Sequence, residues 1–377
     1  MEFTLNEEQE MLKTSVRDFL TTKCPKTYVK QMEADDKGYT EELWKEMAGL
    51  GWQGLALPEK YGGSGMKLLD LSLLVEEIGR ACLPGPFFST VILGAMTLSE
   101  SGNDAQKQKY LPGVASGSSI ATFAITEKDA RYEAKCIHFK AVKSGTGYSL
   151  SGSKLFVSDA HIADWMLVAA RTEEGKNAED GITVFIVDAK TPGITTTLLK
   201  TMAHDKLCEV DFKNVHVPAE NIVGEAGKGW PVVARTIERA AVVKCCDSVG
   251  VMQRAFEMTL DYAKDRKQFG KIIGSFQVLQ HYLADMFQDC EGARFASYHA
   301  AWRMGEGKSS MKEAAVAKVF TSDAFERLVT KAHQIHGAVG VTIDHDLHFY
   351  TTRGKAAQLS YGSADYWREV MAKVGGL

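Results

Sequence analysis

The chain has 377 residues, of which 45% are hydrophobic and 24% are charged, and its formal net charge at pH 7 is -4. This length allows two or three packed units, and the composition is too polar for membrane spans. Because the charge is slightly negative and the basic runs are short, nothing favours a nucleic acid or an acidic membrane surface as partner.

The N-terminal sequence and the cysteine pattern indicate in which cellular compartment the protein is expected. Residues 1–4 run directly into a helical pattern, without the segments of a secretory signal or the composition of a transit peptide. The seven cysteines are scattered and include no Cys-x-x-Cys pair. We therefore expect a cytoplasmic protein whose thiols are free and mostly buried.

The first part of the chain has the periodicity of amphipathic helices. Asn6 is a favourable N-cap residue, and apolar residues recur at helical spacing over residues 12–20. Similar patterns cover residues 43–52 and 68–81. The sequence predicts an N-terminal α-helical domain over residues 1–118.

The period then changes to two, which is typical of β-strands. Residues 165–169 and 182–187 are rich in β-branched and other apolar types, and apolar residues alternate with polar ones over 208–212. A middle β domain is therefore predicted over residues 119–224.

The last part of the chain is helical again. Three long segments are predicted at Trp230–Arg266, Phe276–Gly305 and Met311–His336, separated by short breaks that contain glycine. These lengths favour an antiparallel bundle over residues 225–377.

Two common kinds of site are not indicated. No Gly-x-Gly-x-x-Gly follows a strand and opens a helix, and we interpret residues 224–229 as a flexible connection rather than a phosphate loop. His336, Asp344, His345, Asp346 and His348 lack a recognised metal-ligand spacing, so we expect ordinary packing there and no metal.

Several local sequences resemble those of the acyl-CoA dehydrogenase superfamily, in the same order and approximate spacing. They are Ile125-Thr126-Glu127, Lys154-Leu155-Phe156-Val157-Ser158, Asp265-Arg266-Lys267-Gln268-Phe269-Gly270, Gln277, Gln334-Ile335-His336-Gly337 and Gly362-Ser363. The resemblance covers essentially the whole chain. It implies an acyl-CoA dehydrogenase-like fold with an N-terminal all-α domain, a middle β-sandwich or barrel and a C-terminal four-helix bundle, and a flavoprotein oxidoreductase that uses FAD.

The resemblance also implies how FAD is held. Thr126 and Ser158 would lie at the pyrimidine edge and near N5 of the isoalloxazine ring, Phe156 would lie against its face, and Arg266 would neutralise the pyrophosphate. The other implied cofactor contacts are Ile125, Phe269, Gln277, Gln334, Gly337, Ser363 and Asp365. In relatives some of these groups reach the flavin of a neighbouring subunit, so a homotetramer, or a heterotetramer with a paralogous subunit, is expected.

The usual catalytic base of the family is missing. Such an enzyme removes a proton from the carbon next to the thioester carbonyl, a task that suits a carboxylate. Tyr361 stands where the commonest subfamily has its glutamate, and Ala240 matches the seat used by a second subfamily. A phenol with a pKa of about 10 is a poor proton acceptor at neutral pH. The candidate replacements are Glu238, Asp247 and Asp365, although Asp365 is more typical of a flavin contact.

Four interpretations stay open at this point. A relocated carboxylate could serve as base, or Tyr361 could donate a proton in an enoyl-CoA reductase. The chain could instead be a non-catalytic subunit that completes the FAD site of a paralogue, or it could carry out 1,4-oxidation of a cyclic acyl-CoA.

The acyl group and the redox partner are expected from the same resemblance. Phe87, Phe88 and Ser89 align with the end of the acyl tunnel, where two aromatic rings favour a short, branched or cyclic acyl-CoA. An electron-transfer flavoprotein is the implied electron acceptor.

Overall fold

The computed structural model describes residues 4–376, and the contacts within the chain divide it into two compact units. The sheet unit comprises residues 31–66 and 84–240. The bundle unit comprises the described part of residues 1–30, 67–83 and 241–377. Helices from the first 118 residues therefore fall into both units.

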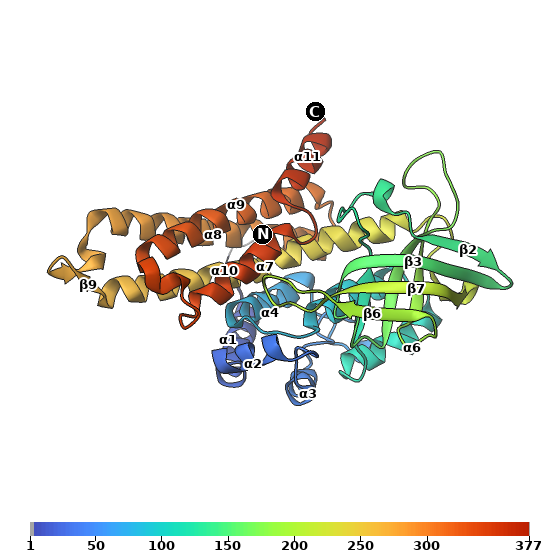
Figure 1. The fold of residues 1–377 in the computed structure, drawn as a ribbon, viewed down its shortest axis with the longest axis horizontal. Helices are drawn as coiled ribbons and strands as arrows, with labels where there is room; N and C mark the ends of the chain where they lie inside the picture. Colours follow the sequence, from blue (N-terminus) through green and yellow to red (C-terminus); the bar gives the residue numbers. More distant parts are fainter. Residues whose placement is uncertain (1–3, 377) are drawn as a thin grey trace. The chain divides into compact units, whose positions relative to one another are not determined.

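The sheet unit is built on one eight-stranded sheet. Its strands are β1 (Ala121–Ala124), β2 (Lys140–Ser144), β3 (Gly147–Ser158), β4 (Trp165–Arg171), β5 (Ile182–Asp188), β6 (Ile194–Leu198), β7 (Leu207–Pro218) and β8 (Ile222–Val223). The strand order is β6-β7-β3-β2-β4-β5-β8, and β1 pairs with β4 in parallel. Figure 1 shows β3, β7 and β6 side by side.

The burial of the strands follows their sequence patterns. In β7, buried residues alternate with more exposed ones up to Phe212, as the alternation predicts. In β4 and β5, all residues from Trp165 to Ala170 and from Ile182 to Val187 are buried. Both faces of these two strands are covered, which explains why their sequences are continuous apolar runs rather than alternating ones.

Seven short helices complete the sheet unit. They are α3 (Glu41–Gly49), η1 (Glu59–Tyr61), the π-helix η2 (Phe88–Ala95), α5 (Met96–Ser101), α6 (Asp104–Ala115), η3 (Ala134–Cys136) and η4 (Ala219–Asn221). The buried Arg239 guanidinium donates to the carbonyl oxygen of Ile92 in η2 at 3.0 Å and pairs with Glu100 at 2.6 Å. The bond to Ile92 satisfies one backbone carbonyl oxygen in a helix that has the unusual π-type hydrogen-bond pattern.

The bundle unit contains the long helices. They are α1 (Glu7–Lys23), most of α2 (Lys26–Ala34), α4 (Leu68–Ala81), α7 (Trp230–Asp265) from residue 241, α8 (Gln277–Gly305), α9 (Met311–His336), α10 (Leu347–Leu359) and α11 (Ala364–Val374). Shorter elements are the hairpin of β9 (Lys267–Gln268) and β10 (Lys271–Ile272), η5 (Ile273–Ser275) and η6 (Gly337–Val341). Helices α7, α8 and α9 match the predicted segments to within one residue.

Helices α4 and α7 meet through their backbones. A Cβ atom on Gly79 would lie 2.0 Å from the Asp247 carbonyl oxygen, and one on Gly250 would lie 1.8 Å from the Glu76 carbonyl oxygen, so both would clash. Only glycine allows so close an approach. The crossing therefore fixes α4 firmly against the bundle.

Two further expectations can be compared with the structure. All seven cysteines are buried thiols that form no disulfide, which confirms the prediction about them. Within residues 4–376, none of the helices combines the length and the apolar character needed to cross a bilayer.

Candidate active site

In the sheet unit, Thr126 is fixed to strand β3. Its hydroxyl donates to the carbonyl oxygen of Leu155, and the Leu155 N–H donates to the Thr126 carbonyl oxygen at 2.9 Å. This pair of hydrogen bonds brings together two of the segments that the resemblance assigns to the flavin.

A buried ion pair supports the same segment. The Lys154 ammonium group is fully buried and donates to the carbonyl oxygen of Ile125 at 3.0 Å and to the Glu127 carboxylate at 2.9 Å. Glu127 also accepts the backbone N–H groups of His138 and Phe139. Burial lowers the pKa of Lys154 to about 8, and Glu127 opposes this shift.

The end of strand β3 is strained. Phe156 and Asp159 have φ angles of 57° and 55°, which non-glycine residues rarely adopt, and the register of β3 against β7 shifts between Lys154 and Val157. The Ser158 carbonyl oxygen accepts from the Thr122 hydroxyl at 2.6 Å, which links the end of β3 to β1. Strain of this kind is concentrated at functional sites.

Residues 87–89, which align with the end of the acyl tunnel, contact this strained end of β3. Ser89 donates to the Asp159 carboxylate at 2.6 Å, and both side chains are buried. Phe87 is buried, whereas Phe88 is partly exposed. Sequence reasoning missed Asp159, whose only signal is a carboxylate directly after Ser158.

In the bundle unit, a pocket of about 630 Å³ brings together four of the residues expected to bind FAD. Arg266, Phe269, Gln334 and Gly337 all line it, although up to 71 positions separate them in the chain. Gln277 lies between two lining residues but does not line the pocket itself.

Two features of this pocket are typical of a ligand site. Phe269 has a φ of 52°, which is unfavourable for a non-glycine residue. The residue is also 91% exposed, and a large exposed aromatic side chain is typical of a surface that a ligand or partner covers. His336 lines the pocket, and its buried Nε2 atom has no hydrogen-bond partner among the described residues. The residues present therefore fit a large aromatic ligand with polar groups.

Tyr361 is buried and also strained. Its φ is 56°, and its carbonyl oxygen accepts the indole N–H of Trp367 at 2.9 Å. Ser363 caps α11 by accepting the N–H of Tyr366. The Asp365 side chain is 89% exposed and pairs with Arg368, so within this chain it lacks the burial expected of a base.

The two other candidate bases differ in burial. Glu238 is 6% exposed and its carboxylate accepts from Arg235 at 3.0 Å. The Asp247 side chain is 18% exposed and accepts from Lys244 at 3.3 Å, while its backbone takes part in the α4–α7 crossing. Ala240 is buried and offers no acid, as its side chain dictates. Among residues 4–376, no group of His, Cys, Asp and Glu side chains is arranged to hold a metal ion.

Comparison with protein families decides the identity of the chain. Residues 6–118, 122–215 and 227–376 match the N-terminal, middle and C-terminal domains of acyl-CoA dehydrogenases. The chain belongs to the acyl-CoA dehydrogenase family. It is accordingly an oxidoreductase and a flavoprotein that uses FAD.

Individual proteins resemble the chain over all or most of its length. The probable acyl-CoA dehydrogenase YngJ of Bacillus subtilis is 34% identical over 99% of both chains. The caffeyl-CoA reductase-Etf complex subunit CarC of Acetobacterium woodii is 32% identical over 89% of both chains.

Solved structures agree with this assignment. Butyryl-CoA dehydrogenase from Megasphaera elsdenii superimposes with a TM-score of 0.93 at 32% identity and covers 100% of both chains. A structure described as the FAD complex of PigA superimposes with a TM-score of 0.92 at 26% identity, also over 100% of both chains. The three-domain acyl-CoA dehydrogenase fold is confirmed.

Proposed function

We propose that this acyl-CoA dehydrogenase oxidises a short, branched or cyclic acyl-CoA thioester at its α and β carbons, with Glu238 as the base. The observation that carries the base assignment is the burial of the Glu238 carboxylate. Glu238 is the least exposed of the three candidate carboxylates.

The FAD isoalloxazine, when bound, supplies the acceptor for the β-hydride. The residues proposed to hold FAD lie in segments 125–126 and 156–158 of the sheet unit and in the bundle unit, where four of them line the pocket. Thr126 and Ser158 offer polar groups, the half-exposed ring of Phe156 offers an apolar wall, and Arg266 offers a guanidinium for the pyrophosphate. Ile125, Gln277, Ser363 and Asp365 complete the proposed set.

The proposed reaction gives separate roles to Glu238, to Tyr361 and to the residues at the end of the acyl tunnel. The thioester loses its α-proton to the Glu238 carboxylate and its β-hydrogen as hydride, so that a carbon–carbon double bond forms. Tyr361 would orient the thioester by donating from its phenol. The buried Phe87 and Ser89 would limit the length of the acyl group.

Anaerobic flavin bleaching tests the proposal. The FAD-loaded protein is mixed with butyryl-, isovaleryl-, cyclohexanecarboxyl- and palmitoyl-CoA, and loss of the visible flavin absorbance is followed. We expect fast bleaching with one of the first three. Glu238→Gln should slow it by about 10²-fold or more, whereas Asp247→Asn, on the same helix, should stay within about threefold.

Three outcomes would contradict the proposal. A chain that holds FAD but is bleached by none of these thioesters would not be an acyl-CoA oxidant of the proposed kind. A larger loss in Asp247→Asn than in Glu238→Gln would move the base to Asp247. A chain that takes up FAD only when co-expressed with a paralogue would favour the role of a non-catalytic subunit.

Reduction of an enoyl-CoA is the second candidate function. It is favoured by the phenol at position 361 and by the similarity to a caffeyl-CoA reductase subunit. In this direction Tyr361 would donate a proton to the α-carbon, so Tyr361→Phe should slow enoyl-CoA reduction by dithionite-reduced enzyme by at least about tenfold. An unchanged rate would eliminate this role.

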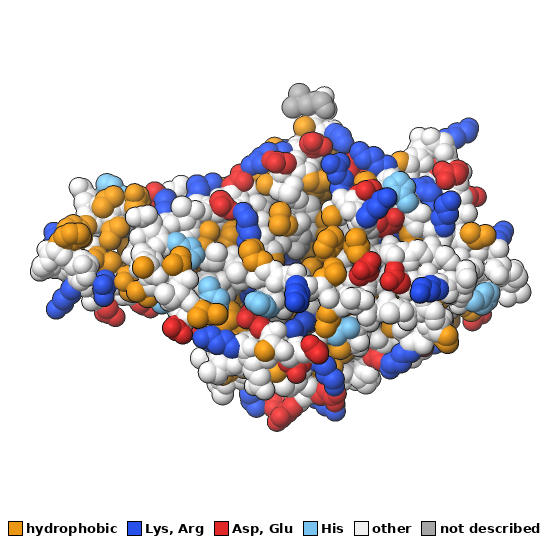
Figure 2. Space-filling model, in the orientation of Figure 1, with side chains coloured by type: hydrophobic (Ala, Val, Ile, Leu, Met, Phe, Trp, Pro, Cys, Tyr) orange, Lys and Arg blue, Asp and Glu red, His pale blue; other side chains and the backbone are white. Residues whose placement is uncertain are grey.

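The proposed partners are an electron-transfer flavoprotein and further copies of the chain or a paralogue. The Etf complex of the CarC relative supports the first. Exposed apolar side chains of the bundle unit support association with further copies of the chain or a paralogue. Phe269, Ile272 and Val278 lie in or near the β9–β10 hairpin, where hydrophobic atoms gather in Figure 2. Exposed clusters of this kind mark interfaces, and we propose a tetramer.

A further inference from the structure

The bundle unit contains a second pocket that the proposed reaction does not use. It has a volume of about 350 Å³ and lies among α1, the start of α2, α4, α7 and α10. None of the residues proposed to bind FAD or the thioester lines it. We call it the arginine pocket and define it by Arg17, Thr21, Lys26, Arg80, Arg254 and Tyr350, which all line it.

Positive charge exceeds negative charge in the arginine pocket. Four cationic side chains line it, and Glu77 is the one carboxylate among its lining residues. Glu257 pairs with Arg80 and Arg254 from outside the lining, so cations still exceed carboxylates by two when it is included. A small ligand with two negative charges would balance this excess.

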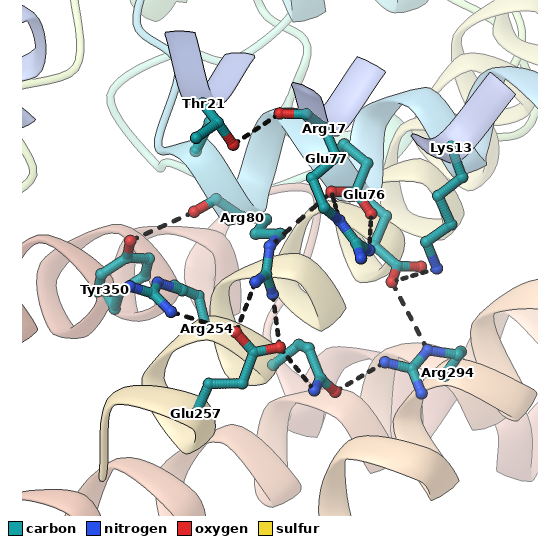
Figure 3. A network of polar contacts seen from close by, with 12 residues as sticks. Lys13, Arg17, Thr21, Glu76, Glu77, Arg80, Arg254, Glu257, Arg294 and Tyr350 are labelled. Atoms are coloured by element: carbon teal, nitrogen blue, oxygen red, sulfur yellow. Dashed lines mark hydrogen bonds and ion pairs between the residues drawn. The ribbon is translucent and has the colours of Figure 1, made fainter. Parts of the chain in front are cut away.

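The two carboxylates hold the arginines in defined positions. Glu77 is buried and accepts from Nε and Nη2 of Arg17 at 2.9 and 2.6 Å. Glu257 accepts from both Nη atoms of Arg80 at 2.8 and 2.5 Å. Figure 3 shows the resulting chain of contacts from Arg17 to Tyr350. Each guanidinium has five N–H donors, so these pairings leave donors for a ligand.

Parts of this cluster are open to solvent. The side chains of Arg17 and Arg254 are 44% and 39% exposed, so a dissolved ion has access to them. The negative C-terminal end of α4 is already covered, because Lys26 donates to the carbonyl oxygen of Ala81 at 2.7 Å. The repulsion that a helix C-terminus exerts on anions is thereby reduced.

We propose that the arginine pocket binds a small ligand that carries a phosphate group with two negative charges. Guanidinium groups fixed by carboxylates present pairs of N–H donors whose spacing matches phosphate oxygens. The Tyr350 side chain forms an aromatic part of the wall, suited to the organic part of such a ligand. The site is independent of the proposed dehydrogenation.

Two substitutions on one helix give a matched test. Thr21 lines the pocket and Thr22 does not; both are exposed, and each hydroxyl donates to the carbonyl oxygen four residues earlier. Binding of inorganic phosphate to the FAD-loaded protein is measured by calorimetry at low salt. We expect Thr21→Glu to weaken binding at least tenfold and Thr22→Glu to change it less than twofold.

Arg254→Gln provides a second disruption that leaves the pair of Arg80 and Glu257 in place, and it should also weaken binding at least tenfold. The proposal is overturned if the wild type shows no saturable phosphate binding, or if Thr21→Glu and Thr22→Glu weaken it equally. It is also overturned if Arg266→Gln abolishes the binding while Thr21→Glu does not, because the ion would then occupy the flavin region. Flavin bleaching by thioesters is measured separately, and its failure would leave this result unaffected.

Discussion

The ammonium group of Lys318 donates a hydrogen bond to the carbonyl oxygen of Ala357, four residues before Tyr361. Lys318 is buried, and the carbonyl belongs to the last turn of α10. A cation at this position stabilises the end of the helix. Lys154 has a similar relationship to Ile125, next to Thr126. Each of the two lysines thus supports a segment assigned to the active site.

Replacing Lys318 by Met should impair catalysis more than folding. Loss of the hydrogen bond costs about 1–3 kcal/mol, but removal of a buried charge offsets part of this cost. We expect a net change in unfolding free energy below about 2 kcal/mol and a fall in kcat of at least about tenfold with KM little changed. Lys312→Met, exposed on the same helix, is the control. Equal kcat values for the two variants would contradict a positioning role for Lys318.

The buried lysines predict a pH dependence of stability. Burial lowers the pKa of Lys154 and of Lys318 from 10.5 to about 8. Between these values the unfolded chain binds more protons than the folded one, so stability rises with pH in that window. Each lysine contributes at most about 3 kcal/mol of this rise. In urea unfolding between about pH 7 and pH 10, the wild type should gain stability relative to Lys154→Met and Lys318→Met. If the unfolding free energy changed with pH in the same way in the wild type and in both variants, burial would not lower the pKa of these lysines.

Replacing Phe269 by Gly should separate folding from cofactor binding. Glycine accepts the φ of 52° without strain, and the lost ring is almost fully exposed, so the unfolding free energy should change by less than about 1 kcal/mol. If the ring covers FAD or a neighbouring subunit, its removal costs about 1.5–3 kcal/mol of binding. FAD titration and sedimentation measure this loss. Val142→Ala, at an exposed site in β2, should leave both unchanged. Unchanged FAD affinity and assembly in Phe269→Gly would show that the assignment is wrong.

Replacing Glu76 by Ala should strongly destabilise the bundle unit. The buried Glu76 carboxylate accepts from Lys13 at 2.8 Å and pairs with Arg294 at 3.6 Å (Figure 3). It also accepts from the Tyr298 hydroxyl. Its removal takes a carboxylate away from the partly buried Lys13 and Arg294, although Arg294 still pairs with Glu291, at a cost of about 3–5 kcal/mol. Urea unfolding measures the effect, and Glu76→Gln, which keeps an acceptor, should lose less. A cost below about 1 kcal/mol for the Ala variant would mean that water compensates these charges.

The elements that the sequence predicts best are those with a strong period. Helices α7, α8 and α9 have long periodic patterns and end at polar or glycine-containing breaks. The π-helix η2 was not predictable, because its sequence is a uniformly apolar run and the wider turn depends on tertiary contacts such as that of Arg239 with Ile92. The β9–β10 hairpin was missed because its strands have two residues each.

The candidate site was predictable only where a family resemblance supplied it. Arg266 and Gln334 share a pocket that no local pattern connects. Lys154 and Lys318 were passed over because charged residues are normally assigned to the surface. Their burial depends on partners that are distant in sequence, at Ile125 and Ala357.

The glycine crossing of α4 and α7 has a consequence for how this chain can exchange parts with its relatives. Helix α4 comes from the N-terminal family segment and α7 leads into the C-terminal one, yet their main chains touch at Gly79 and Gly250. A chimaera joined near residue 118 would therefore need parents that both carry glycine at their half of the contact. A gene rearrangement that ignored this requirement would wedge the two helices apart, even though its junction lay outside both of them.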